Sequence, residues 1–167
     1  MTEIRATTAD ISRLNLLWRR IRPAAISGVG GFLVIYLLAG LTDRFDWPLL
    51  VAPFGASCVL VFALPQSPLA RPKNLVFGHL ISAFIGLCVL ALLGPGPLSL
   101  AIAVGLAIAA MQATDTLHPP AGADPIVVLL SGAPWSFLVF PILAGTLAIF
   151  AVAWAYHRYV SGRPYPV

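Results

Sequence analysis

Long apolar stretches separated by short polar ones dominate this chain. Four of them, residues 24–41, 75–93, 98–114 and 136–157, are nearly free of charged side chains. A bilayer hydrocarbon core roughly 30 Å thick is crossed by about 20 helical residues, at about 1.5 Å of rise for each residue. The four stretches come close to this length, so the pattern predicts an all-α integral membrane protein.

Two further apolar stretches are shorter and contain helix breakers. Residues 47–64 are interrupted by Pro53 and Gly55, and residues 120–131 begin with the second of two consecutive prolines. A helix of about eleven residues covers only about 17 Å, roughly half of the hydrocarbon. Each segment can cross only with an extended lead-in that is buried in protein or faces water. We therefore expect about six spans, two of them short broken helices starting at Pro53 and Pro120. The alternative is four full spans plus re-entrant segments.

The distribution of positive charge supports six crossings. If both short segments cross and the N-terminus is cytoplasmic, nine of the ten Lys and Arg residues fall on the cytoplasmic side. Only Arg44 is left outside, beside Asp43 and Asp46. This asymmetry is the one that the positive-inside rule predicts. We expect a multi-pass protein of the cell inner (plasma) membrane with its N- and C-termini in the cytoplasm.

The first 23 residues differ from the rest of the chain. Ile11, Leu14, Trp18 and Ile21 recur at helical spacing among several arginines, which is typical of an interfacial helix. The alternative is a frayed tail with scattered apolar residues. We expect a cytoplasmic interfacial helix over 1–23, a single transmembrane domain over 24–160 and a cytoplasmic tail over 161–167.

The two short segments begin alike, which suggests an internal repeat. One begins Pro53-Phe-Gly-Ala-Ser57 and the other Pro120-Ala-Gly-Ala-Asp124. Each is flanked by one long span on either side, so the chain divides into units at about 24–93 and 98–157. Units of three spans have opposite orientations in the membrane, which makes this a 3+3 inverted repeat. Chance similarity between two Pro/Gly breaks is the alternative.

A helix that begins inside the membrane predicts an anion site. Its first backbone N–H groups lack partners within the helix, and the helix dipole places a partial positive charge there. Two such ends aimed at one place near the midplane would bind a small anion mostly through the main chain. Glycine and alanine at these positions permit close approach of a ligand to the backbone.

Composition narrows the functional classes. The chain is 59% apolar and 10% charged, which is unlike a soluble domain of 167 residues. Its ten basic residues form no patch interleaved with aromatic side chains, so nucleic-acid binding is not expected. Both cysteines lie within apolar stretches, and the three histidines are far apart in the sequence, so neither a disulfide, a metal site nor a cofactor is expected.

Several motifs in one order resemble a known family. They are His118-Pro119-Pro120 followed by Ala-Gly-Ala, the upstream Pro-x-Gly-Ala-Ser, and Ser67-Pro-Leu-Ala-x-Pro72. Over residues 22–161 the chain resembles the HPP family of integral membrane proteins. The resemblance implies transport, since chloroplast and cyanobacterial members are associated with nitrite movement. Members are often described with four spans, and Asp124 stands where the family pattern has an amide. A carboxylate there repels an anion unless it is protonated.

The residues expected to bind substrate are those of the two broken-helix starts, and those expected along the pathway are polar residues near them. His118 is expected to donate to the anion or carry a proton, although a capping role before two prolines is equally open. His79 has the alternative of an ordinary interhelical hydrogen bond. The substrate-binding candidates are Pro53, Phe54, Gly55, Ala56, Ser57, His118, Pro119, Pro120, Ala121, Gly122, Ala123 and Asp124, and the pathway candidates are His79, Thr114, Asp115, Thr116, Arg71 and Lys73.

These observations favour a membrane transporter or channel for a small inorganic anion, with nitrite the first candidate. Proton coupling through His118 or Asp124 is a subordinate hypothesis. The expected partners are the anion, membrane lipid and further copies of the chain in a homo-oligomer. One alternative is a non-transporting membrane scaffold subunit. An enzyme is not expected, although Ser57 and His118 would be neighbours if the two repeats face each other, as an intramembrane enzyme would require.

Overall fold

The computed structural model describes the backbone of residues 8–46 and 48–167 and, within the first helix, the side chains from Asn15 onward. All regular elements in these ranges are helices, and no strand occurs among them. Within the described residues, three helices are long and apolar enough to cross a bilayer: Asn15–Phe45, Pro72–Leu93 and Trp135–Ser161. Two shorter apolar helices, Pro53–Ala63 and Pro97–Ala113, lie between them. The prediction of an all-α membrane protein is confirmed.

The first half of the fold holds the first broken segment. Helix α1 (Thr8–Phe45) is followed by α2 (Pro53–Cys58), which continues into the π-helical turn η1 (Val59–Ala63). A 3₁₀ turn, η2 (Pro68–Ala70), leads into α3 (Pro72–Leu93). Proline occupies the first position of α2, η2 and α3, where its missing N–H costs no helix hydrogen bond.

The second half contains α4 (Pro97–Ala113) and then the second broken segment. This segment is a 3₁₀ turn, η3 (Pro119–Ala123), followed by α5 (Asp124–Ser131). The last span consists of η4 (Trp135–Leu138), η5 (Val139–Leu143), α6 (Ala144–Tyr156) and η6 (His157–Ser161). It was expected as one regular helix, but Phe140 has extended dihedrals because the following Pro141 disfavours the helical conformation at that residue.

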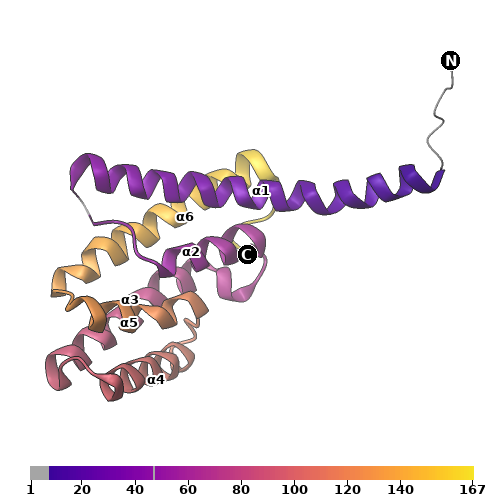
Figure 1. The fold of residues 1–167 in the computed structure, drawn as a ribbon. Coiled ribbons are helices and arrows are strands. Elements are labelled where there is room, and N and C mark those ends of the chain that lie inside the picture. Colours follow the sequence, from indigo (N-terminus) through magenta and orange to yellow (C-terminus); the bar gives the residue numbers. More distant parts are fainter. Residues whose placement is uncertain (1–7, 47) are drawn as a thin grey trace.

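Successive helices from α1 to α6 alternate in direction along the bundle (Figure 1). Hydrogen bonds tie together the segments at one end, since Tyr165 Oη donates to Ala70 O and Arg163 Nη1 donates to Phe62 O. Lys73 and Asp115 form an ion pair at the same end. The alternation agrees with the six-span topology, which together with the inverted repeat stays a prediction.

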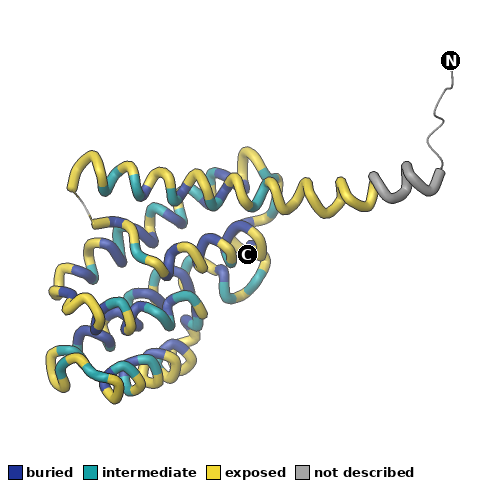
Figure 2. The backbone as a smooth tube through the Cα atoms, viewed as in Figure 1, coloured by how far each residue is buried: buried dark blue, intermediate teal, exposed yellow. Residues whose placement is uncertain are grey.

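Helix α1 does not break where the sequence suggested a domain boundary. It passes through Pro23 as one continuous helix, and residues 15–25 are exposed beyond the rest of the bundle (Figure 2). A proline removes one helix hydrogen bond but does not always end the helix. The expected interfacial helix is therefore continuous with the first span. Residues 1–7, and the side chains of Ile11 and Leu14, lie outside the part that the structure describes.

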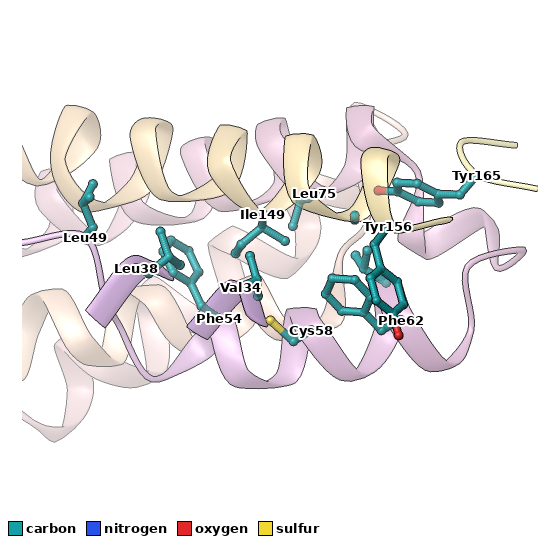
Figure 3. Close-up of a cluster of buried hydrophobic side chains, with 12 residues drawn as sticks. Val34, Leu38, Leu49, Phe54, Cys58, Phe62, Leu75, Ile149, Tyr156 and Tyr165 are labelled. Carbon is teal, nitrogen blue, oxygen red and sulfur yellow. The ribbon is translucent and has the colours of Figure 1, made fainter. Parts of the chain in front are cut away.

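Two apolar clusters stabilise the bundle. The first joins α1, α2 and α6 and contains Phe54 and Phe62 of the first broken segment (Figure 3). The second joins α3, α4 and α5 around Ala83, Ala103 and Val128. The two broken segments thus belong to different clusters and meet where the clusters adjoin.

Candidate functional site

Four polar side chains lie fully buried where the two broken segments meet. Ser57, His79, His118 and Asp124 each have 0% exposed surface, and they come from α2, α3, the lead-in to η3 and the start of α5. We refer to these four residues as the buried polar chain. Burial of polar groups costs free energy unless they are hydrogen-bonded, and in membrane proteins such groups commonly mark functional sites.

Consecutive hydrogen bonds connect the four side chains. Asp124 Oδ2 lies 2.7 Å from His79 Nδ1, and His79 Nε2 lies 2.8 Å from Ser57 Oγ. Ser57 Oγ lies 2.9 Å from His118 Nε2, and His118 Nδ1 lies 2.9 Å from Leu69 O. Both imidazoles therefore converge on one serine hydroxyl, which also lies 3.3 Å from Pro53 O.

Helix α3 holds the second broken segment through one face. Asn74 Nδ2 donates to Leu117 O at 2.9 Å, and Ser82 Oγ donates to Ala121 O at 2.6 Å. Between them, Gly78 allows His118 to approach, because a Cβ at this position would lie 2.8 Å from His118 Cβ. Neither Asn74 nor Ser82 is identified from the sequence as a residue that holds this segment. Their spacing of eight residues on one helical face was the available signal.

The first broken segment is anchored at its C-terminal end. His157 Nε2 donates to Val61 O at 3.1 Å, and both Ser27 Oγ and Arg163 Nη1 donate to Phe62 O. These donors satisfy carbonyls at a helix C-terminus, where positive charge is also favourable. His157 and Arg163 were not identified as having this role from the sequence, since nothing in the local pattern pairs them with residues about 100 positions away.

The first backbone N–H groups of the broken segments have local partners. Phe54 N donates to Val51 O at 3.0 Å, and Gly55 N donates to Ala52 O at 3.1 Å. Ala121 N donates to His118 O at 3.0 Å, and the two prolines before it have no N–H. The polar groups that converge here are therefore mainly side chains, whereas the sequence predicted main-chain amides.

Two hollows flank the buried polar chain. A cleft of about 620 Å³ lies between the starts of the broken segments, and its walls are mainly proline and alanine. A second hollow of about 260 Å³, which we call the vestibule, opens at the positively charged end of the bundle. The vestibule is lined by Pro68, Leu69, Arg71, Lys73, Asn74, Gln112, Asp115 and Leu117. Leu69 connects the vestibule to the buried polar chain, because its carbonyl oxygen accepts the hydrogen bond from His118.

An ion pair lies in the vestibule. Lys73 Nζ donates to Asp115 Oδ2 at 2.8 Å, and this hydrogen bond and the charges of Lys73 and Arg71 lower the pKa of the Asp115 carboxyl. The pair therefore persists at neutral pH and is lost as the pH falls through that lowered pKa. Asp115 is fully exposed, so the pair sets the charge of the vestibule more than the stability of the fold.

A family model now identifies the chain. The model for the transmembrane region of HPP proteins matches residues 18–166. The chain belongs to the HPP family. Two transmembrane proteins of Dictyostelium discoideum are similar to it, at 33% and 31% identity over 95% of this chain. The chain spans about half the length of these relatives, 52% of one and 56% of the other. No solved structure matches it.

The signature triplet of the HPP family has a clear structural place here. His118 joins the buried polar chain, while Pro119 and Pro120 start η3. Of the predicted substrate-binding residues, Ser57, His118 and Asp124 converge with the pathway residue His79, and the start of α2 packs beside them through Pro53 and Phe54. Gly55 and Gly122 face open space.

The remaining predicted residues divide between the cleft and the vestibule. Ala56, Pro119, Pro120 and Ala123 line the cleft, and Ala121 is buried against Ser82. Arg71, Lys73 and Asp115 line the vestibule, beside the hydrogen-bonded hydroxyls of Thr114 and Thr116. Among the described residues, no group of three or more His, Cys, Asp or Glu side chains is arranged to hold a metal ion.

Proposed function

We propose that this HPP protein is a transporter or channel for a small inorganic anion, with nitrite the first candidate substrate. The observation that carries the proposal is the convergence of His79 Nε2 and His118 Nε2 on the Ser57 hydroxyl, buried where the two broken segments meet. The Ser57 hydroxyl and the His79 imidazole can donate hydrogen bonds to an anion's oxygens, and His118 Nε2 can do so when its imidazole is protonated. Among the apolar side chains that pack around this site, such donors give a small polar ion its favourable contacts near the midplane.

The charges at the vestibule support an anion rather than a cation. Arg71 and Lys73 face it with one opposing carboxylate, Asp115, so its charged side chains sum to a positive charge. A hollow with positively charged walls raises the local concentration of anions. An anion that enters there reaches Leu69 and Asn74, which contact His118 and its neighbour Leu117.

The same proposal includes the setting of the protein. We place it in an inner (plasma) membrane with both termini in the cytoplasm, because the vestibule end carries Arg71, Lys73 and Arg163 while the opposite end carries Arg44 beside two aspartates. Membrane lipid then contacts the exposed apolar side chains on the outside of the bundle, and some of that surface is available to a homo-oligomer.

The experiment is nitrite uptake into liposomes containing the purified protein, with uptake by protein-free liposomes subtracted. We expect His118→Gln to reduce the rate about three- to tenfold, because the glutamine amide cannot hold both Leu69 O and Ser57 Oγ in the imidazole geometry. The matched control is His157→Gln, which alters a buried histidine that caps η1 outside the buried polar chain. Equal losses in both variants would argue against the site.

One observation favours a second candidate function. Asp124, His79 and Ser57 are connected in the order acid, imidazole, hydroxyl that acyl-transfer enzymes use. Against it, the Ser57 hydroxyl is shared with a second imidazole, which is not part of an acyl-transfer triad. A fluorophosphonate probe distinguishes the two functions. A covalent adduct on Ser57 would favour the enzyme, and an unmodified Ser57 in folded protein would leave transport as the function.

A further inference from the structure

We infer that the buried polar chain relays a proton between Asp124 and His118, and that a proton therefore accompanies the transported anion. This inference rests on the proposed function and adds the coupling ion to it. It is carried by the direction of the hydrogen bonds and by one carboxyl oxygen that has no partner.

The direction of the hydrogen bonds follows from one fixed end. Leu69 O is a carbonyl, so His118 Nδ1 must donate to it. A neutral His118 then accepts at Nε2, and the donor is the Ser57 hydroxyl at 2.9 Å, closer than the 3.3 Å to Pro53 O. Ser57 Oγ in turn accepts from His79 Nε2. A neutral His79 accepts at Nδ1, which requires a donor on Asp124 Oδ2.

The surroundings of the second carboxyl oxygen, Asp124 Oδ1, indicate that the donor is the O–H of a protonated Asp124. Oδ1 is buried and has no hydrogen-bond partner. A carboxylate oxygen in this position would leave negative charge buried without a donor, whereas the carbonyl oxygen of a protonated carboxyl costs much less. A protonated Asp124 also supplies the O–H that His79 Nδ1 needs. With Asp124 protonated, every member of the buried polar chain is neutral, and each hydrogen bond is donated in the direction from Asp124 to His118.

The same heavy-atom positions support a charge-separated form. Three proton transfers convert the neutral form into the charge-separated one. The Asp124 O–H proton moves to His79 Nδ1, the His79 Nε2 proton moves to Ser57 Oγ, and the Ser57 proton moves to His118 Nε2. Three O–H or N–H bonds break and three form. The products are an Asp124 carboxylate and a His118 imidazolium, with no change in the number of protons. The imidazolium provides the positive charge that favours an anion at this place.

Few other ionisable groups lie around the relay. The elements packed on it contribute Cys58 from α2, Lys73 and Cys88 from α3, and Tyr156 from α6, while α4 and η3 have no titratable side chain. Arg71, Lys73 and Asp115 line the vestibule, where His118 Nδ1 is separated from the hollow by the Leu69 carbonyl. Proton exchange with water takes place at the His118 end, where the Nδ1–H must leave Leu69 O and pass its proton to a water of the vestibule, and Asp124 is the buried end of the relay.

The test is Asp124→Asn, whose amide N–H can still donate to His79 Nδ1 but cannot release a proton. We expect wild-type protein in liposomes to take up nitrite faster under an inward proton gradient. The lumen should acidify in proportion to the nitrite taken up. Uptake by Asp124→Asn should lose this dependence on the gradient and the acidification. Asp43→Asn, which removes an exposed carboxylate at the end of the bundle opposite the vestibule, should keep both. Proton movement in Asp124→Asn equal to that of wild type would overturn the inference.

An infrared measurement tests the relay without transport. Purified wild-type protein at neutral pH should show the C=O stretch of a protonated carboxyl, and this band should be absent from Asp124→Asn and present in Asp43→Asn. A wild-type spectrum without the band would overturn the inference even if nitrite is transported. Absence of uptake together with the band would contradict the proposed function while leaving a protonated Asp124 in place.

Discussion

Ser57→Ala is expected to abolish most nitrite uptake, with a rate at least about tenfold below wild type. The substitution removes one oxygen and leaves both His79 Nε2 and His118 Nε2 without their shared partner in a fully buried place. The substitution also removes a hydroxyl donor to the anion, and a hydrogen bond to a charged group contributes about 1.5–3 kcal/mol, where 1.4 kcal/mol corresponds to about a factor of ten. The measurement is the initial rate of uptake into liposomes at equal protein content.

Ser99→Ala is the matched control for this variant. Ser99 is also a buried serine, but it lies in α4 and outside the buried polar chain. Its replacement should leave uptake within about twofold of wild type, as expected of a site that does not contact the substrate. Thermal unfolding of both variants in detergent shows whether they are folded. A folded Ser57→Ala protein with the wild-type rate would remove Ser57 from the transport site.

Gly78→Ala is expected to lower the thermal stability clearly, and more than the other substitutions proposed here. A Cβ at this position would lie 2.8 Å from His118 Cβ and 2.9 Å from Thr116 O. Neither atom is the end of a flexible side chain, so the lead-in to η3 must move away from α3. Overpacking of this kind typically costs about 1–3 kcal/mol. The measurement is the midpoint of thermal unfolding in detergent.

Gly105→Ala shows what the same change does without the clash. Gly105 lies in the interior of α4, and a Cβ there has nothing within 4 Å. Alanine is favoured over glycine in a helix by about 0.5–1 kcal/mol, so this variant should be as stable as wild type or slightly more stable. A Gly78→Ala protein with the midpoint of Gly105→Ala would show that α3 and the His118 segment do not pack as described.

The helices were predictable because length and proline placement determine them locally. The apolar stretch 75–93 became α3, and the prolines at positions 53 and 72 each start a helix. The second broken segment begins at Pro119 as a 3₁₀ turn, one residue before the predicted start, and becomes α-helical at Asp124. The π-helical turns η1 and η5 were not predictable, since they depend on how neighbouring segments pack.

The site was only partly predictable, for reasons of distance along the chain. Ser57, His118 and Asp124 were identified because they sit at helix breaks in an apolar sequence. His79 received only a pathway role, because its contacts with Ser57 and Asp124 join residues 22 and 45 positions apart. The sequence suggested main-chain amides as anion ligands. In the folded chain Phe54 N and Gly55 N have local acceptors, which a one-dimensional pattern does not reveal.

Histidine nitrogen NMR tests most directly whether the buried polar chain binds the anion. The chain has three histidines, and His157 serves as an internal control outside the buried polar chain. With ¹⁵N-labelled histidine in detergent-solubilised protein, a nitrite titration should shift the imidazole signals of His79 and His118 to saturation and leave His157 unchanged. His157→Gln assigns the control signal. If nitrite left the signals of all three histidines in folded protein unmoved, or shifted those of His157 as much as the others, the account of an anion site at Ser57 would be contradicted.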